Sequence, residues 1–191
     1  MVVESSAPSS AELPPSPPWR GVNHLALVTP DMDATVRFYT GVLGMPLVMT
    51  LMAGPMRHYF FEIAPHNTIA FFEIAGAETF AKGAGSPAPH PVQMDHISLN
   101  LDDEAALETL RGRLLAAECE VTDVVDHGVL RSVYFSDNNG IALEATWWVD
   151  DGTGRPFDPD DADLFQDPDP VPAIAELAGG SIGALPRTRL V

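Results

Sequence analysis

The sequence of 191 residues has few basic residues, a single cysteine and no long apolar run, and each shortage excludes a class of protein. Its ten lysines and arginines face 27 aspartates and glutamates, and a net charge of −17 disfavours binding to nucleic acid or to an anionic membrane surface. The single cysteine, Cys119, excludes an intrachain disulfide and fits a reducing compartment. Neither a bilayer-spanning apolar run nor a secretory signal is present. We therefore expect a cytoplasmic protein with no nucleic-acid or membrane partner.

Composition separates the two ends of the chain from its middle. Residues 1–20 are rich in serine, proline and alanine, which predicts a disordered N-terminal tail. Residues 150–191 form an acidic, proline-rich C-terminal extension, in which the apolar segment Val171 to Leu177 predicts a short helix. Residues 21–149 are left as a single domain, and the chain is apolar enough overall to give that domain a core.

A His…Glu pattern occurs twice within this domain at nearly the same spacing. Glu73 follows His24 by 49 positions, and Glu144 follows His96 by 48 positions. Each histidine opens an apolar run typical of a strand, and each glutamate lies within a second such run. The repeat predicts two copies of one supersecondary unit, module 1 over residues 21–76 and module 2 over residues 93–149.

The same order of elements is predicted in both modules. After each histidine strand an aspartate that can cap a helix follows, Asp31 in module 1 and Asp102 or Asp103 in module 2. Three β-rich runs complete each copy, so the order βαβββ predicts an α+β fold. The runs are Pro46–Leu51, Arg57–Ile63 and Thr68–Ile74, then Glu120–Val125, Leu130–Phe135 and Ile141–Trp148.

Alternation along the strands predicts where the repeated side chains point. His96, Ser98 and Asn100 share one face of their strand, and the apolar residues between them share the other. Glu144 shares its face with small residues, whereas Glu73 shares its face with apolar ones. If the modules pack as a pseudo-twofold pair, two imidazoles and two carboxylates can converge on one divalent first-row metal ion.

Three segments resemble a known family: HLALVTPDMDATVRFYTGVLGMPL, DHISLNL and DHGVLRSVYFSDNNGIALEA. They are similar to the vicinal oxygen chelate superfamily, which includes glyoxalase I, methylmalonyl-CoA epimerase, extradiol dioxygenases and bleomycin or fosfomycin resistance proteins. The resemblance covers roughly residues 21–149. It implies two βαβββ modules that form a cup-shaped mixed sheet around a metal site, a small-molecule substrate and a homodimer. It is specific for the fold and less so for the reaction.

The resemblance also implies a set of metal ligands. His24, His96 and Glu144 match a 2-His-1-carboxylate set, which leaves positions open for substrate oxygens or O₂. Fe(II) is favoured, with Ni, Zn, Mn and Co as alternatives. Glu73 matches the extra carboxylate that acts as ligand and base in glyoxalase I. The alternative interpretation is two structural histidines and solvent-facing glutamates.

Two further residues favour a particular branch of the family. Tyr134 lies ten positions before Glu144, as the active-site tyrosine of extradiol dioxygenases does, and His127 matches a histidine-bearing loop of catechol dioxygenases. Such a pair would hydrogen-bond a bound catecholate and move protons. Otherwise Tyr134 is a cross-strand packing aromatic and His127 a surface residue. His58 and His90 fall outside the repeat and are predicted to be surface or loop histidines.

Together these features predict a metal-dependent enzyme, with Fe(II) extradiol cleavage of a catechol-like substrate as the first hypothesis. A glyoxalase or epimerase type of lyase or isomerase, using a divalent metal and a glutamate base, is the alternative. A metal-free protein that binds small molecules such as drugs is the third possibility, and it would not require the metal triad.

Overall fold

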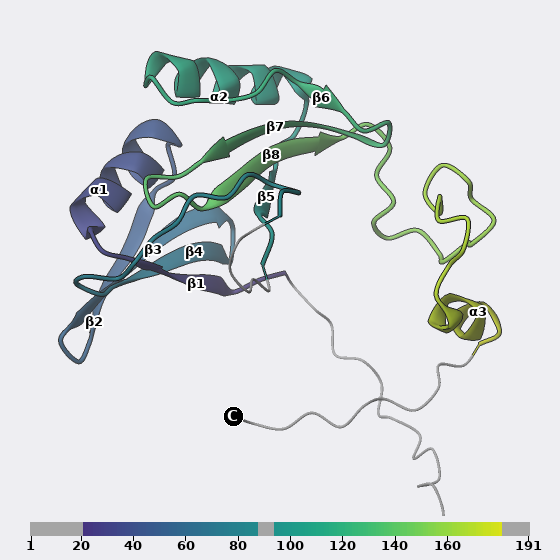
Figure 1. Ribbon diagram of the computed structural model, residues 1–191, viewed down its shortest axis with the longest axis horizontal. Helices are drawn as coiled ribbons and strands as arrows, with labels where there is room; N and C mark the ends of the chain where they lie inside the picture. The colour runs from purple at the N-terminus through teal and green to yellow at the C-terminus, as the bar shows by residue number, and fades with distance from the viewer. Residues whose placement is uncertain (1–20, 88–93, 181–191) are drawn as a thin grey trace, which may run out of the picture. The chain divides into compact units, whose positions relative to one another are not determined.

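The computed structural model describes residues 21–87 and 94–180, so the predicted N-terminal tail lies outside the described residues. The chain divides into two compact units, of which one ends at Asp151 and the other contains the residues that follow. The first unit holds two four-stranded mixed sheets with their helices (Figure 1). This confirms the predicted α+β fold built from two βαβββ modules.

Module 1 begins with strand β1, and Asp31 caps the helix that follows by accepting a hydrogen bond from the Ala34 N–H at 3.0 Å. Gly44, with φ of +80°, provides the left-handed conformation that ends this helical segment. Strands β1 and β4 pair in parallel, the other pairs are antiparallel, and the order is β1-β4-β3-β2. The elements are β1 (His24–Thr29), α1 (Met32–Val36), the π-helix η1 (Arg37–Val42), β2 (Leu47–Ala53), β3 (Met56–Ala64) and β4 (Asn67–Glu73).

Module 2 repeats this plan with the order β5-β8-β7-β6, in which β5 and β8 are parallel. Asp103 caps its helix through the Ala106 N–H at 2.8 Å. Helix α2 runs along strands β7 and β8 (Figure 1). The elements are β5 (Ile97–Asn100), α2 (Glu104–Ala116), β6 (Val125–Asp126), β7 (Leu130–Ser136) and β8 (Ala142–Trp148).

The predicted strand Glu120–Val125 is wrong. This segment forms only one isolated bridge, between Val121 and Phe135, before the two-residue strand β6. The hydroxyl of Thr122 accepts the hydrogen bond of the Tyr134 N–H at 3.0 Å, in the role that a carbonyl of a regular strand would take. Because a side chain replaces a main-chain partner, the segment leaves the strand ladder at this point.

One hydrophobic core joins the two modules. It lies on the helix-facing side of both sheets and includes the fully buried Phe61, Phe71, Val133 and Leu143. Buried hydrogen bonds reinforce this junction: the Tyr39 hydroxyl donates to Asp137 at 3.0 Å, and the Thr29 hydroxyl donates to Asn139 at 2.8 Å. The opposite faces of the sheets, which carry His24 and Glu144, are therefore free to form a site.

The second unit is described over residues 152–180. Phe157 and Phe165 make an edge-to-face contact with ring centroids 5.3 Å apart. Helix α3 (Pro172–Ala178) forms where the apolar segment predicted a short helix, and a proline occupies its first turn. No helix within the described ranges is long and apolar enough to cross a membrane.

Candidate functional site

The structure brings together two of the residues that the repeat singled out. Glu144 lies on β8 with its side chain buried, and His96 immediately precedes β5, the parallel neighbour of β8. The Nε2 atom of His96 is 3.0 Å from the Glu144 carboxylate. Burial works against ionisation of Glu144, but hydrogen bonds with Ser132, Ser98 and other neighbours keep its pKa below the ordinary value. The carboxylate is therefore charged at neutral pH.

The other ring nitrogen of His96 is fixed by a second carboxylate. Its Nδ1 atom is 2.7 Å from Asp95, which also pairs with Lys82 and accepts the Gly85 N–H at 2.7 Å. The hydrogen bond from Lys82, followed by those from Gly85 and His96, holds the pKa of Asp95 well below its usual range. Only 7% of the Lys82 side chain is exposed. The segment that joins the modules thus supplies a buried cation that holds the carboxylate behind His96.

His96 consequently has a carboxylate oxygen at each ring nitrogen. Because a carboxylate only accepts hydrogen bonds, the Nδ1 atom donates its proton to Asp95. The Nε2 atom then faces Glu144 at 3.0 Å, so that a nitrogen and a carboxylate oxygen lie side by side. A carboxylate behind the ring is the kind of partner that orients a metal-ligating histidine.

Tyr134 and His127 complete the cluster from β7 and the loop before it. The Tyr134 hydroxyl is 2.8 Å from the Nε2 atom of His127, and Tyr134 is paired with Glu144 across the β7–β8 ladder. Burial, and then the neighbouring Glu144 carboxylate, raises the pKa of Tyr134. The phenol therefore keeps its proton at neutral pH and acts as a hydrogen-bond donor.

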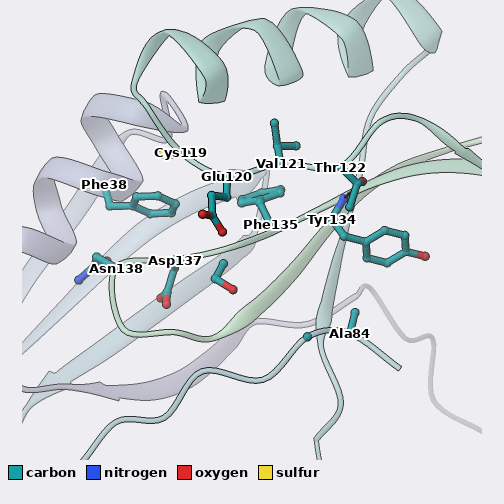
Figure 2. A pocket seen from close by; sticks show the side chains of 12 residues that line it. Phe38, Ala84, Cys119, Glu120, Val121, Thr122, Tyr134, Phe135, Asp137 and Asn138 are labelled. Carbon is teal, nitrogen blue, oxygen red and sulfur yellow. Dashed lines mark hydrogen bonds between the residues drawn. The ribbon is translucent and has the colours of Figure 1, made fainter. Parts of the chain in front are cut away.

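A cavity of about 590 Å³ lies beside β7 and includes Tyr134 in its wall. Figure 2 shows the ring of Tyr134 extending from β7 away from Phe38 and Asp137, which also line the cavity. The wall is formed by Phe38, Gly83, Ala84, Cys119, Glu120, Val121, Thr122, Tyr134, Phe135, Ser136, Asp137 and Asn138.

His24 lies on the corresponding face of module 1, apart from this cluster. Its Nδ1 atom is 2.7 Å from the side-chain oxygen of Asn23, which fixes the ring as the residue before His96 does in module 2. Its ring packs edge to face against Phe60 at 5.6 Å and His58 at 6.3 Å. Among residues 21–87 and 94–180, no three His, Cys, Asp or Glu side chains are close enough to hold a metal ion.

Glu73 is not brought to the cluster. It lies on the helix-facing side of β4, where its carboxylate accepts the Met32 N–H at 2.9 Å and pairs with Arg57. The Met32 N–H, and then Arg57, lowers its pKa. The strand register explains the difference from the expected position. Glu144 lies 48 positions after His96, and this even spacing puts the two side chains on the same face of their sheet. Glu73 lies 49 positions after His24, and this odd spacing puts it on the opposite face from His24.

His58 is the residue that the sequence interpretation missed. The prediction of a surface or loop histidine is wrong, because His58 lies in β3 with 8% of its surface exposed. Its ring stacks on Phe72 with centroids 3.6 Å apart, and its Nε2 atom is buried without a hydrogen-bond partner. Burial, and then the nearby His24, lowers its pKa, so the ring is neutral at pH 7. The alternating pattern Arg57–Ile63, which was predicted as a strand, is the signal that could have indicated its burial.

These contacts test the fit of a divalent metal. His96 and Glu144 are a nitrogen and an oxygen donor, already 3.0 Å apart and oriented by neighbours that hold each of them. They fit one half of an N/O metal site. The second imidazole expected from the repeat, His24, lies on the other sheet with its Nδ1 hydrogen-bonded, which leaves Nε2 for coordination.

Comparison with known proteins agrees with this architecture. A glyoxylase/bleomycin resistance protein/dioxygenase domain from Frankia sp. EAN1pec is 24% identical with a TM-score of 0.58, and the match covers 69% of this chain and 99% of that chain. Lactoylglutathione lyase from Agrobacterium tumefaciens is 25% identical with a TM-score of 0.50, covering 69% and 96%. A glyoxalase family protein from Enterococcus faecalis is 16% identical with a TM-score of 0.53, covering 67% and 98%.

No curated protein matches the chain. The match to a family is nevertheless extensive, since it spans residues 21–145 and so takes in both modules and all the predicted site residues. The chain belongs to the Glyoxalase/Bleomycin resistance protein/Dioxygenase superfamily.

Proposed function

We propose that this protein is a metal-dependent enzyme that acts on a small molecule with two adjacent oxygen atoms, and that its reaction is Fe(II)-dependent extradiol cleavage of a catechol-like substrate. The observation that supports it is the hydrogen bond between Tyr134 and His127 beside the His96 and Glu144 pair. A phenol and an imidazole next to a metal-binding pair are suited to proton transfer on a bound substrate.

His96 and Glu144 would hold the metal together with His24. A ferrous ion bound there would supply adjacent positions for the two substrate oxygens and for O₂. Asp95 keeps the ring of His96 in place, and Lys82 keeps Asp95 in place. Ser98 supports the Glu144 carboxylate through a hydrogen bond, which helps to orient this second donor.

Tyr134 and His127 would handle the protons. The phenol carries its proton at neutral pH, because burial and Glu144 raise its pKa, and it can donate a hydrogen bond to a substrate oxygen. The Nε2 atom of His127 lies 2.8 Å from the same hydroxyl and can accept or return that proton.

A proton-transfer reaction of the glyoxalase or epimerase type is the second candidate, favoured by the 25% identity to lactoylglutathione lyase. Glu73 is poorly placed to be its base, since it binds Met32 and Arg57 on the helix side of the sheet. Glu144 would have to take that role. The third candidate, metal-free binding, leaves unexplained why His96 faces a carboxylate at both ring nitrogens.

We also propose a homodimer in which His24 of one copy completes the half-site of the other. The face of module 1 that carries His24 also exposes Val28, Met49 and Leu51, each more than 40% accessible. Exposed apolar side chains around a potential ligand favour burial against a partner. The continuous core between the modules of one chain opposes a rearrangement that would bring its own His24 to Glu144.

Metal analysis of protein purified without oxygen tests the site. We expect about one divalent ion per chain, and both His96→Ala and His24→Ala should lose most of it. Mixing the two variants under conditions that exchange subunits should restore metal to about half of the mixed dimers' sites, because each mixed dimer regains one complete set. Parent-like metal content in His96→Ala would contradict the site, and failure of the mixture to regain metal would contradict its sharing between copies.

A further inference from the structure

His58 is the one buried side chain near the candidate site whose chemistry the account so far leaves unused. It is nine-tenths buried, and the Nε2 atom of its ring has neither solvent nor a hydrogen-bond partner. Among all side-chain nitrogen and oxygen atoms of the described residues, only Trp147 Nε1 shares this condition. A buried, unpartnered nitrogen destabilises a fold unless another group occupies it, so this atom is a candidate for ligand binding.

The position of His58 places that nitrogen on the face that carries His24. Strand pairing aligns Val28, Phe72 and His58 across β1, β4 and β3, and Val28 is on the His24 side of β1. Ala70, one pair along, has only a methyl group, and this leaves room for the two imidazole rings to approach each other over it. Their centroids are 6.3 Å apart at an interplanar angle of 67°.

This separation suits two imidazoles on one metal ion. With metal–nitrogen bonds of about 2.0–2.1 Å, each centroid lies roughly 3.2 Å from the metal, so the centroids of two bound rings are about 5–6.5 Å apart. The Phe72 ring holds the His58 ring in place by stacking at 3.6 Å, while the Asn23 side chain holds the His24 ring through Nδ1.

We propose that His58 is a further metal ligand, so that module 1 supplies two imidazoles, His24 and His58, to a divalent transition-metal ion. The inference rests on the proposed function in taking His24, His96 and Glu144 as ligands of one metal ion. It replaces the carboxylate that Glu73 was expected to contribute, and it makes the complete set richer in nitrogen: three imidazoles and the Glu144 carboxylate. Such a set suits Fe(II), Zn, Ni and Co rather than the oxygen-preferring Mg and Ca.

The test compares the binding of Co(II) to full-length metal-free protein and to three variants. His58→Phe keeps the aromatic stack on Phe72 and removes both nitrogens, and His58→Gln keeps a polar group. His66→Asn is the matched control, because it removes a histidine from the turn between β3 and β4 while retaining a residue that tolerates the observed φ of 69°. Affinity is measured by competition with a chelator, and unfolding temperature is measured without metal.

We expect His58→Phe to bind Co(II) about tenfold more weakly or worse, with an altered Co(II) absorption spectrum, while its unfolding temperature stays the same or rises. In the parent loaded with Cu(II), the electron paramagnetic resonance spectrum should show one more coupled nitrogen than in either His58 variant. His66→Asn should match the parent in affinity and spectrum.

Parent affinity and parent spectra in His58→Phe, in a protein where His96→Ala loses the metal, would overturn this inference and leave the proposed function standing. Retention of metal by His96→Ala would instead overturn the proposed site itself. A packing role for His58 predicts a third pattern, a lower unfolding temperature with unchanged Co(II) affinity, and that pattern also contradicts the inference.

Discussion

The two sheets share one topology and differ in the side chains of the face opposite the helices. In both modules the strand residue two positions after the repeat histidine has a parallel partner, which is Ala70 in module 1 and Glu144 in module 2. The antiparallel neighbour of that partner is Phe60 in module 1 and Tyr134 in module 2. At equivalent points of the fold, module 2 has a carboxylate and a phenol where module 1 has a methyl group and a phenyl ring.

The next pair along the strands continues the contrast. Module 2 has Ser132 opposite Thr146, whose hydroxyls hydrogen-bond at 3.0 Å, and module 1 has His58 stacked on Phe72. The two modules therefore share one backbone topology and carry different side chains on this face. In the proposed function, module 2 would supply the acid, the base and one half of the metal site, while module 1 would supply imidazoles.

The largest effect that this division predicts is on metal binding by the two repeat glutamates. Glu144→Ala removes a donor and should weaken metal binding by about 100-fold or more, since loss of a supporting group alone costs about 10–100-fold. Glu73→Gln is the matched control on the opposite face and should keep the metal. It should lower the free energy of unfolding by about 1 kcal/mol, because Glu73 caps the first turn of α1. Chelator competition and thermal unfolding provide both measurements, and loss of metal in Glu73→Gln would remove the distinction between the faces.

The next effect concerns the phenol. Tyr134→Phe should lower turnover by about tenfold or more, because one positioned donor is lost while the ring remains. Tyr59→Phe is the control, since Tyr59 lies on the helix-facing side of module 1. Steady-state oxygen uptake at equal iron occupancy measures both variants. If Tyr134→Phe matches the parent, Tyr134 is a packing residue and the proton-transfer reaction gains support.

A smaller effect should follow from the residue behind His96. Lys82→Met keeps the buried methylene chain but removes the charge that holds Asp95, so His96 is less well oriented. We expect metal affinity to fall by about tenfold, with partial recovery in Lys82→Arg. Calorimetric titration with Zn(II) would measure this, and equal affinities in all three proteins would show that the linker plays no part in the site.

The smallest effect on function is predicted at the junction of the modules. Tyr39→Phe removes the hydroxyl that donates to buried Asp137 and should lower the free energy of unfolding by about 1–2 kcal/mol, with metal content unchanged. Burial raises the pKa of Asp137, and the Tyr39 hydrogen bond opposes this rise. A carboxyl with a raised pKa in the folded state loses its stabilising contribution as pH rises through that value. The variant should therefore lose more stability at neutral pH than in acid, and denaturant unfolding at both pH values would show whether it does.

Much of the fold was predictable because local signals agreed. The caps Asp31 and Asp103, the turn at Gly44 and the alternation in the strands all follow from short-range chemistry. The failed strand near Thr122 shows the limit, since a side chain there makes the hydrogen bond that a regular strand takes from the main chain.

The site was predictable where it depends on one hairpin or one strand pair. The proximity of Tyr134 to Glu144 follows from the β7–β8 register, and the face of Glu144 follows from alternation. The partnership of Lys82 with Asp95 depends on the path of a linker, which no periodicity encodes. The face of Glu73 was not predicted, because spacings of 49 and 48 look equivalent in the sequence. The one extra residue places Glu73 on the opposite face of its sheet from His24.

The central claim is that the polar face of module 2 carries out ring cleavage on a metal-bound aromatic substrate. Oxygen uptake by the iron-loaded protein with a panel of catechols, paired with hydrogen exchange between substrate and deuterated solvent in the absence of oxygen, tests it most directly. Ring cleavage requires one O₂ consumed per substrate opened, and no solvent exchange without oxygen. Exchange of substrate hydrogen without any oxygen consumption would contradict it and identify proton transfer as the reaction.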